Sequence, residues 1–141
     1  MKKILSILLL VIICSGCFWT RTKTLKCSLS TNIDEVSINY YYVFTYKKDK
    51  IDNLSLKVEL LGDNNASTKI YNKYVSEYER ISNDHSSVIV NFDEKKKLID
   101  LNFYITKDNY QVLNELNLSF VKNTSFNDLK KDLGNTEYKC K

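Results

Sequence analysis

The sequence predicts one α+β domain, an antiparallel sheet of about five to six strands with two helices packed on one face, in the order βββαββαβ. Three observations support this fold class. Apolar and polar residues alternate along five segments of the chain, which is the period of a strand with one buried face. Two other segments repeat apolar residues at helical spacing. Polar turns separate neighbouring strand segments, which favours antiparallel hairpins.

Three strands begin the predicted domain. Alternation of apolar and polar residues predicts the first strand from Leu25. Residues 36–46 predict a long second strand, and Tyr41 and Val43 add apolar bulk to its second face, which indicates a central position in the sheet. After a lysine-rich turn, residues 54–60 alternate again and predict the third strand.

A helix and a second hairpin follow. Apolar residues recur at helical spacing over residues 70–81, and Ser67 or Thr68 is a candidate N-cap. A polar segment at residues 83–86 ends this helix. Residues 88–92 and 99–105 then alternate as the two strands of a hairpin.

The C-terminal part contains a second helix and a short strand. Ser125 followed by Asp128 predicts a capped helix start, and Gly134 is a natural helix stop. Residues 136–140 then predict a final short strand beside the first one. The segment 107–123 is compatible with either a short helix or a packed loop.

The N-terminal residues predict export and lipid attachment. Two lysines precede a short apolar run, and small residues lead into Cys17. The run is shorter than the roughly 20 residues of a bilayer-spanning helix. We interpret residues 1–16 as a lipoprotein signal peptide, Cys17 as the lipidated residue, 17–24 as a tether and 25–141 as the domain. Ordinary secretion with cleavage near Gly16, or an uncleaved signal anchor, is the alternative.

This interpretation places the domain outside the cytoplasm, anchored to the cell membrane by palmitate or similar acyl chains on Cys17. Two or more chains are needed for stable anchoring, because one chain alone gives only reversible membrane binding.

The net charge and the distribution of basic residues limit the class of partner. Removing residues 1–16 takes away two of the 21 basic residues and none of the 17 acidic ones, which leaves a formal charge of about +2. The longest basic run, Lys95 to Lys97, directly follows Asp93 and Glu94, so we interpret it as a solvated turn. Nucleic-acid binders concentrate basic residues in a patch, and this chain shows none in its sequence. We therefore expect no nucleic-acid partner.

The cysteine count predicts a disulfide. Cys14 leaves with the signal peptide and Cys17 carries lipid, so Cys27 and Cys140 remain as a pair near the two ends of the domain. In an oxidising compartment they are expected to form a bridge, and two free thiols are the alternative. A zinc site needs about four Cys or His ligands, and one histidine with two distant cysteines does not supply them. We expect neither a metal nor a cofactor.

No catalytic motif accompanies the single histidine, His85. It lies in a polar segment between Asp84 and Ser86, without the nucleophile elbow of a serine hydrolase. We interpret it as a histidine of a surface turn. The adjacent carboxylates of Asp93 and Glu94 lie in a solvated turn and lack the burial that raises an acid's pKa. The sequence therefore predicts a non-enzymatic protein.

Tyrosines are the candidate ligand-lining residues. Tyr40 and Tyr42 lie on the long strand and Tyr74 and Tyr78 on the first helix, so they could line a cleft for a peptide, a glycan or a hydrophobic ligand. The alternative is that they are core residues with hydroxyls at the rim, which the alternation alone explains. Solvent exposure of Tyr41 or Tyr104 would favour a binding role.

Several local patterns resemble those of the YehR-like lipoproteins and related small surface lipoproteins of low-GC bacteria. They are residues 24–28, the strand end at residues 45–51, the tyrosine-rich helix near residues 70–81, and residues 128–131 with 137–141. The resemblance implies an antiparallel sheet with helices on one face, in a family without an established activity. It carries over no functional residue.

Together these inferences predict a lipid-anchored, non-catalytic surface domain that binds an unidentified partner or supports the envelope. The alternative function is a small-molecule or peptide binder that uses a tyrosine-lined cleft. A cleft of several hundred cubic ångströms would favour the second, and a filled core with a flat apolar patch would favour protein contact.

Overall fold

The computed structural model describes residues 22–106 and 109–141. The described elements, in chain order, are β1 (Thr22–Ile33), β2 (Val36–Lys47), β3 (Lys50–Leu61), α2 (Asn64–Asp84), β4 (Val88–Asp93), β5 (Leu98–Tyr104), α3 (Tyr110–Glu115), η2 (Ser119–Val121), α4 (Phe126–Gly134) and β6 (Lys139–Cys140). This order confirms the predicted α+β class. The predicted signal peptide, Cys17 and most of the tether lie outside the described residues.

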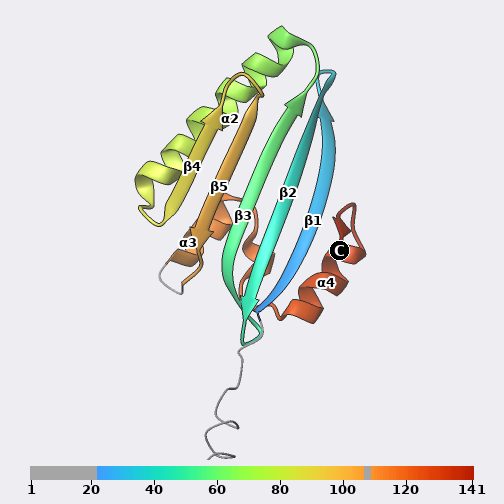
Figure 1. Ribbon diagram of the computed structural model, residues 1–141, viewed down its shortest axis with the longest axis vertical. Coiled ribbons are helices and arrows are strands. Elements are labelled where there is room, and N and C mark those ends of the chain that lie inside the picture. Colours follow the sequence, from blue (N-terminus) through green and yellow to red (C-terminus); the bar gives the residue numbers. More distant parts are fainter. Residues whose placement is uncertain (1–21, 107–108) are drawn as a thin grey trace, which may run out of the picture.

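One antiparallel sheet of six strands forms the front layer of the molecule, in the order β4-β5-β3-β2-β1-β6. Figure 1 shows the helices behind this sheet, with α2 along β4 and β5 and α4 beside β1. The face toward the viewer is uncovered. The two-layer arrangement with one open sheet face is therefore the one that the alternation predicts.

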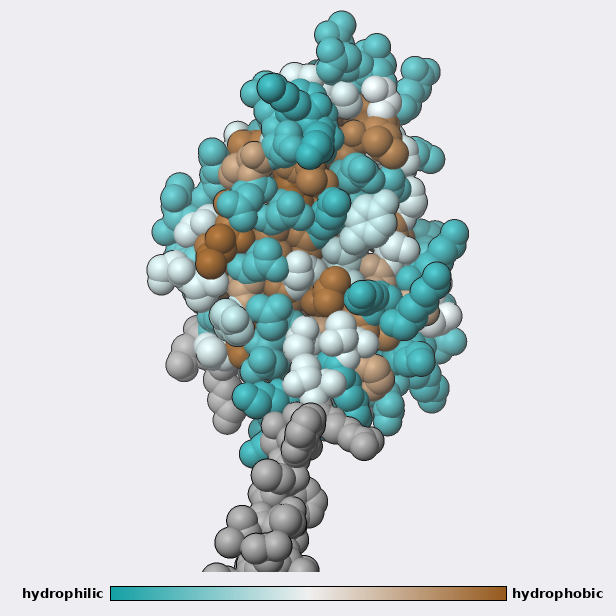
Figure 2. All heavy atoms as spheres, in the orientation of Figure 1, coloured by the Kyte–Doolittle hydropathy of each residue, from teal (hydrophilic) through white to brown (hydrophobic). Residues whose placement is uncertain are grey.

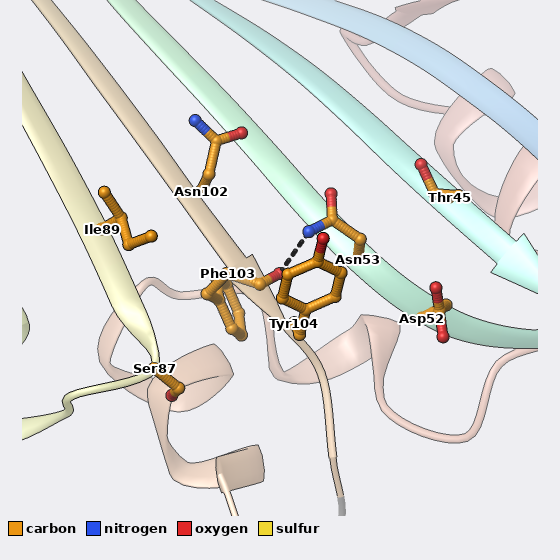
Figure 3. Close-up of a pocket in the computed structure, with 8 residues that line it drawn as sticks. All are labelled: Thr45, Asp52, Asn53, Ser87, Ile89, Asn102, Phe103 and Tyr104. Atoms are coloured by element: carbon orange, nitrogen blue, oxygen red, sulfur yellow. Dashed lines mark hydrogen bonds between the residues drawn. The ribbon is translucent and has the colours of Figure 1, made fainter.

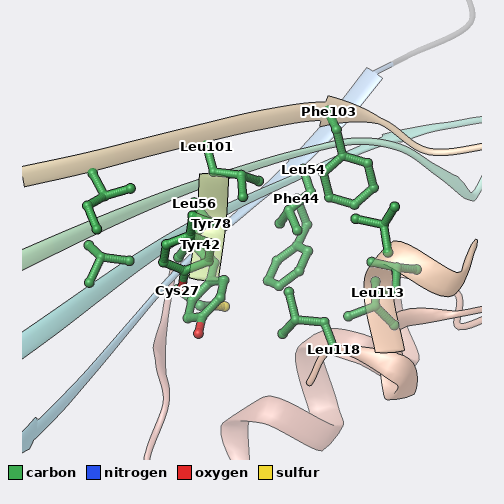
Figure 4. Packing of buried hydrophobic residues seen from close by; sticks show 14 of the residues in the cluster. Cys27, Tyr42, Phe44, Leu54, Leu56, Tyr78, Leu101, Phe103, Leu113 and Leu118 are labelled. Atoms are coloured by element: carbon green, nitrogen blue, oxygen red, sulfur yellow. The ribbon is translucent and has the colours of Figure 1, made fainter. Parts of the chain in front are cut away.

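The core lies between the sheet and the helices. Alternate residues of the central strands, such as Phe44 of β2 and Leu54 of β3, are fully buried on the helix-facing side. Figure 4 shows them packing toward Leu113 and Leu118 from the segment of α3 and η2. Side chains one position along each strand point to the open face, which explains why the alternating pattern located β2 and most of β3. β3 begins at Lys50, four residues before the predicted start, because Lys50 and Ile51 pair with Lys47 and Tyr46 of β2 across a register shift that breaks the alternation.

Strand β1 begins at Thr22, three residues before the start predicted from alternation, so residues 22–24 belong to the domain and not to the tether. The register explains the difference, because Thr22 pairs with Lys47 and Thr24 with Thr45 of β2. Backbone pairing extends the strand where all the side chains are polar and exposed, and such residues give no periodic signal.

Helix α2 begins earlier than predicted, and Asp63 caps it in place of Ser67 or Thr68. One carboxylate oxygen of Asp63 accepts hydrogen bonds from the backbone N–H groups of Asn65 and Ala66. Ser67 and Thr68 lie inside the helix, and their hydroxyls donate to the carbonyl of Asn64. An aspartate satisfies the free N–H groups of a helix start as well as a serine does, so the polar run 63–68 offered several equivalent caps.

The segment 107–123, predicted as either a short helix or a packed loop, contains α3 and η2, with residues 107 and 108 outside the description. Val112, Leu113, Leu118 and Val121 are fully buried or nearly so and tie this segment to the core. At the C-terminus Ser125 caps α4 as predicted. The final strand is shorter than the predicted 136–140, because the N–H of Thr136 still bonds to the carbonyl of Leu133 and only Lys139 and Cys140 pair with β1.

Cys27 of β1 and Cys140 of β6 are joined by a disulfide, as predicted, across a sequence separation of 113 residues. The two residues are also register partners in the sheet. Next to them, Lys26 and Lys141 exchange two backbone hydrogen bonds of 3.1 and 2.8 Å. The bridge therefore fixes the C-terminal end of the chain to the first strand.

Candidate functional site

A cleft of about 310 Å³ lies between α2, the helix-facing side of the sheet and the segment that follows α3. The four tyrosines singled out from the sequence, Tyr40, Tyr42, Tyr74 and Tyr78, all line it. The remaining lining residues come from α2 itself and from three other parts of the chain, namely β1, β3 and the end of α3 with the residues after it: Glu77, Leu29, Thr31, Leu56, Glu115, Leu116 and Asn117. The volume is at the lower end of the range for small-ligand pockets.

Local structure explains how these tyrosines converge. Tyr40 and Tyr42 are two residues apart on β2, so both side chains leave the same face of the sheet. Tyr74 and Tyr78 are four residues apart on α2, so they lie one turn apart on the same helix face. Because α2 packs on the helix-facing side of the sheet, the two pairs meet.

The tyrosine rings contact one another and form a continuous aromatic wall. The rings of Tyr40 and Tyr42 stack with centroids 6.3 Å apart and planes 14° from parallel. Tyr74 lies across from Tyr40 with a centroid distance of 6.5 Å, and its own neighbour Tyr78 is 6.0 Å away. The hydroxyls of Tyr40 and Tyr74 share a hydrogen bond. This bond connects the sheet to the helix at the mouth of the cleft.

The two pairs differ in burial. Tyr42 and Tyr78 are each 7% exposed and belong to the core, as the core alternative predicts for them. Tyr40 and Tyr74 are half-buried and pack against that core from its edge. The cleft therefore has a rigid floor of core tyrosines and a rim of two partly accessible ones.

Burial sets the protonation state of these hydroxyls. Removal from solvent is the main cause that raises the pKa values of Tyr40, Tyr42 and Tyr78 well above the ordinary value of 10.0. Neighbouring tyrosines raise them further. The hydroxyls therefore stay neutral at any physiological pH, and they can donate or accept hydrogen bonds but not serve as anionic bases.

Glu115, the last residue of α3, lines the cleft and is fixed by two basic side chains. Its Oε1 lies 2.7 Å from Nε2 of His85, and Nη2 of Arg80 donates to its Oε2 at 3.1 Å. Arg80 also donates to Asp84 at 3.0 Å. The predicted surface-turn role of His85 is wrong, because its side chain is only 10% exposed and contacts α3. The contact joins residues 30 apart in the chain, which local sequence does not reveal.

The hydrogen bond from His85 is the largest cause that lowers the pKa of Glu115, and Arg80 lowers it further. The unfolded chain lacks both partners, so the folded pKa is the lower of the two. Glu115 therefore stabilises the fold above its ordinary pKa of 4.5, and this contribution is lost as the pH falls through the folded value.

In urea unfolding between about pH 6 and about pH 3, we expect Glu115→Gln to reduce the acid-induced loss of stability. An unchanged pH dependence would show that the contacts are not maintained in solution.

Glu77 of α2 is the second carboxylate of the cleft. Its side chain is exposed, and it has no ion-pair partner among the described residues, in contrast to Glu115. A free carboxylate next to a tyrosine wall gives the cleft a negative rim. The sequence analysis did not single out Glu77 or Glu115, because their importance comes from the packing of α2 and α3 against the same tyrosines.

A second hollow of about 540 Å³ lies on the open face of the sheet, between β2, β3, β5 and the start of β4. Figure 3 shows Asn53, Asn102 and Tyr104 on this side of the strands, and the amide of Asn53 donates to the carbonyl of Phe103 at 2.9 Å. Tyr104 is 69% exposed and Tyr41 is 39% exposed. In Figure 2 this face shows hydrophilic side chains with apolar areas between them.

In the described part of the chain, no group of three or more His, Cys, Asp or Glu side chains is arranged to hold a metal ion. None of the described helices is long and apolar enough to cross a membrane. The chain matches no family model, no curated protein and no solved structure. The tyrosine-lined cleft is thus characterised by its own geometry, and it is the place where the predicted tyrosines and two unpredicted glutamates meet.

Proposed function

We propose that this protein is an extracytoplasmic lipoprotein whose domain binds, without catalysis, a ligand that carries a positively charged group. Acyl chains on Cys17 would hold the domain at the cell membrane, and the tyrosine-lined cleft would take the charged group. The observation that carries the proposal is the convergence of four tyrosines and two glutamates in one cleft of about 310 Å³. The YehR-like resemblance is compatible with this function and does not specify a ligand.

The chemistry of the cleft favours a cationic group. Tyrosine faces attract organic cations by about 0.5 to 2 kcal/mol each, depending on how far water is excluded. The free carboxylate of Glu77 adds a charge partner at the rim. The neutral hydroxyl of Tyr40 adds hydrogen-bonding capacity for the same group. Together these side chains provide apolar contact, a counter-charge and polar contacts within one small volume.

The lining of the cleft favours binding over catalysis. Among the described residues that line it there is no cysteine, histidine or lysine, and the only ionised side chains are the two glutamates. The burial that keeps the tyrosines neutral removes them as bases. Glu115 is held by His85 and Arg80 with a lowered pKa, which is the opposite of the raised pKa that a general acid needs.

N-acetyl-arginine amide tests the cleft directly. We expect it to shift the NMR signals of Tyr40, Tyr74 and Glu77 with millimolar affinity, and we expect the uncharged citrulline analogue to bind several-fold more weakly. Tyr74→Leu should abolish the shifts, since it removes an aromatic wall of the cleft. Tyr104→Leu is the matched control, because it removes an exposed tyrosine from the opposite face. Equal binding of the charged and uncharged amides would contradict the cationic ligand.

Metabolic labelling tests the anchor. In the native host, we expect radiolabelled palmitate to enter the protein and Cys17→Ala to prevent both labelling and membrane fractionation, because the thiol of Cys17 is the proposed acylation site. Ser76→Ala is the control, since it alters an exposed residue of the domain and leaves both the leader and the disulfide intact. Membrane attachment that survives Cys17→Ala would overturn the lipid anchor without affecting the cleft.

A further inference from the structure

Strand β1 has a free edge. On its outer side, β6 pairs only with Cys27 and Ser28, and Lys141 extends the contact to Lys26. From residue 29 to residue 33, β1 has no neighbour on that side among the described strands. Figure 1 shows this part of β1 as the upper part of the right-hand edge of the sheet, above the C-terminus. Five residues of extended strand span about 17 Å.

The backbone groups that point outward along this edge follow from the pairing with the C-terminus. Lys26 directs both its N–H and its C=O toward Lys141. Because backbone groups in a strand alternate in direction, those of Ser28, Ser30 and Asn32 point to the same side. Ser28 is already paired with Lys139. Ser30 and Asn32 therefore present an N–H and a C=O each to the free edge, and both residues are exposed.

A hollow lies on each side of this edge. On the helix-facing side, Leu29 and Thr31 form one border of the tyrosine-lined cleft. On the open face, a second hollow of about 200 Å³ is lined by Ser30, Asn39 and Tyr41, with Glu137 and Lys139 at its C-terminal border. Successive side chains of an added strand would point alternately into these two hollows, since side chains alternate across a strand.

We infer that residues 29–33 of β1 bind an extended peptide as an added strand of the sheet, with a lysine or arginine side chain of that peptide in the tyrosine-lined cleft. The inference rests on the proposed function of the cleft and names its ligand class. In strand addition, backbone hydrogen bonds supply much of the affinity and pockets for alternate side chains supply specificity. The free edge and the two hollows provide both parts in one place.

The choice of a basic side chain follows from charge and shape. A lysine or arginine can lay its apolar stem along the rings of Tyr40 and Tyr74 and bring its charged head to Glu77. The turn after β1 adds Asp34 and Glu35 directly beyond the free edge. The neighbourhood of the edge is thus acidic at its far end and at the rim of the cleft, which favours a basic peptide.

A second copy of the chain fits this edge less well. In an edge-to-edge dimer of β1 strands, the side chains nearest the cleft would be the copy's own Leu29 and Thr31, which are short and uncharged. They would leave the carboxylate of Glu77 without a partner. A basic side chain of a bound peptide would occupy the cleft, whereas the side chains of a second copy would not.

A phage-displayed library of random linear nine-residue peptides, screened against the domain of residues 22–141 with its disulfide intact, tests the inference. We expect selected peptides to share a lysine or arginine and to bind at least about tenfold more tightly than N-acetyl-arginine amide, because backbone pairing adds to the contact in the cleft. Amide hydrogen exchange of Ser30 and Asn32 should slow at least about tenfold on binding. The amides of Leu29 and Thr31 already point toward β2 and should change little.

Charge variants on one helix separate the cleft from the general surface. Glu77→Gln should weaken the selected peptides several-fold, whereas Glu79→Gln, an exposed residue of α2 that does not line the cleft, should leave binding unchanged. Both variants keep the helix surface polar, so neither should affect folding.

Three results would overturn the inference. The first is a library that yields no peptide, or peptides without a basic residue. The second is peptide binding with unchanged exchange at Ser30 and Asn32. The third is concentration-dependent dimerisation that protects the same amides without peptide. If N-acetyl-arginine amide still binds at the cleft in these cases, strand addition fails while the proposed function stands. If it does not bind, both fail.

Discussion

Replacing both Cys27 and Cys140 with serine is expected to lower the free energy of unfolding by about 4 to 5 kcal/mol. The bridge closes a loop with a sequence separation of 113 residues, so it restricts the unfolded chain strongly. A typical domain has a total stability of about 5 to 15 kcal/mol, so the variant should lose a large share of it. Native backbone pairing at Lys26 and Lys141 would remain possible but would no longer be enforced.

Chemical denaturation of the oxidised protein, the reduced protein and the double variant measures this effect. We expect the reduced protein and the double variant to unfold at the same, much lower denaturant concentration, since both lack the same covalent link. The single variants Cys27→Ser and Cys140→Ser should match the double variant when no intermolecular disulfide forms. A double variant as stable as the oxidised protein would show that the bridge does not form in solution.

Phe44→Ala is expected to cost about 3 to 5 kcal/mol, because it removes a large, fully buried side chain from the centre of the core. The ring of Phe44 stacks on that of Tyr42 with centroids 5.8 Å apart, and the strand is held between β1 and β3. The surrounding strands cannot close the space left by the ring. The destabilisation should appear as a lower midpoint in urea unfolding with an unchanged slope.

Val43→Ala is the matched control, because Val43 precedes the buried Phe44 on β2 and side chains alternate along a strand, so that of Val43 points to the open face. We expect it to cost less than about 1 kcal/mol, since little packing is lost there. Similar losses for the two variants would mean that both faces of the sheet are covered, contrary to the two-layer arrangement.

Side-chain periodicity predicted the central strands well and the chain ends of the fold poorly. β2 alternates along its length and β3 alternates from Leu54 to Leu60, because alternate residues there face the core. A register shift between Thr45 and Tyr46 of β2 interrupts the pattern near Ile51, so the first residues of β3 gave no alternating signal. The polar start of β1 is set by backbone pairing with β2, which leaves no mark in the side chains. Backbone hydrogen bonds also explain why β6 is shorter than predicted. The turn after α4 still includes Thr136, whose N–H bonds to the carbonyl of Leu133, so fewer residues pair with β1.

The residue types of the candidate site were predictable, and its completed geometry was not. Helical and strand spacing placed Tyr74 with Tyr78 and Tyr40 with Tyr42. The contribution of Glu115 depends on α3, a helix of six residues whose sequence also suits a loop. Contacts such as that of His85 with Glu115 form only after α2 and α3 pack together, and no local pattern encodes them.

The position of the disulfide also determines how the molecule would respond to mechanical load. A pull between Thr22 and Lys141 would pass along β1 only as far as Cys27, then through the cystine to the last two residues. The polypeptide between the bridged residues would be bypassed and would carry no tension. A pulling force applied between the two ends of the described chain would therefore leave the tyrosine-lined cleft undistorted as long as the disulfide remains intact.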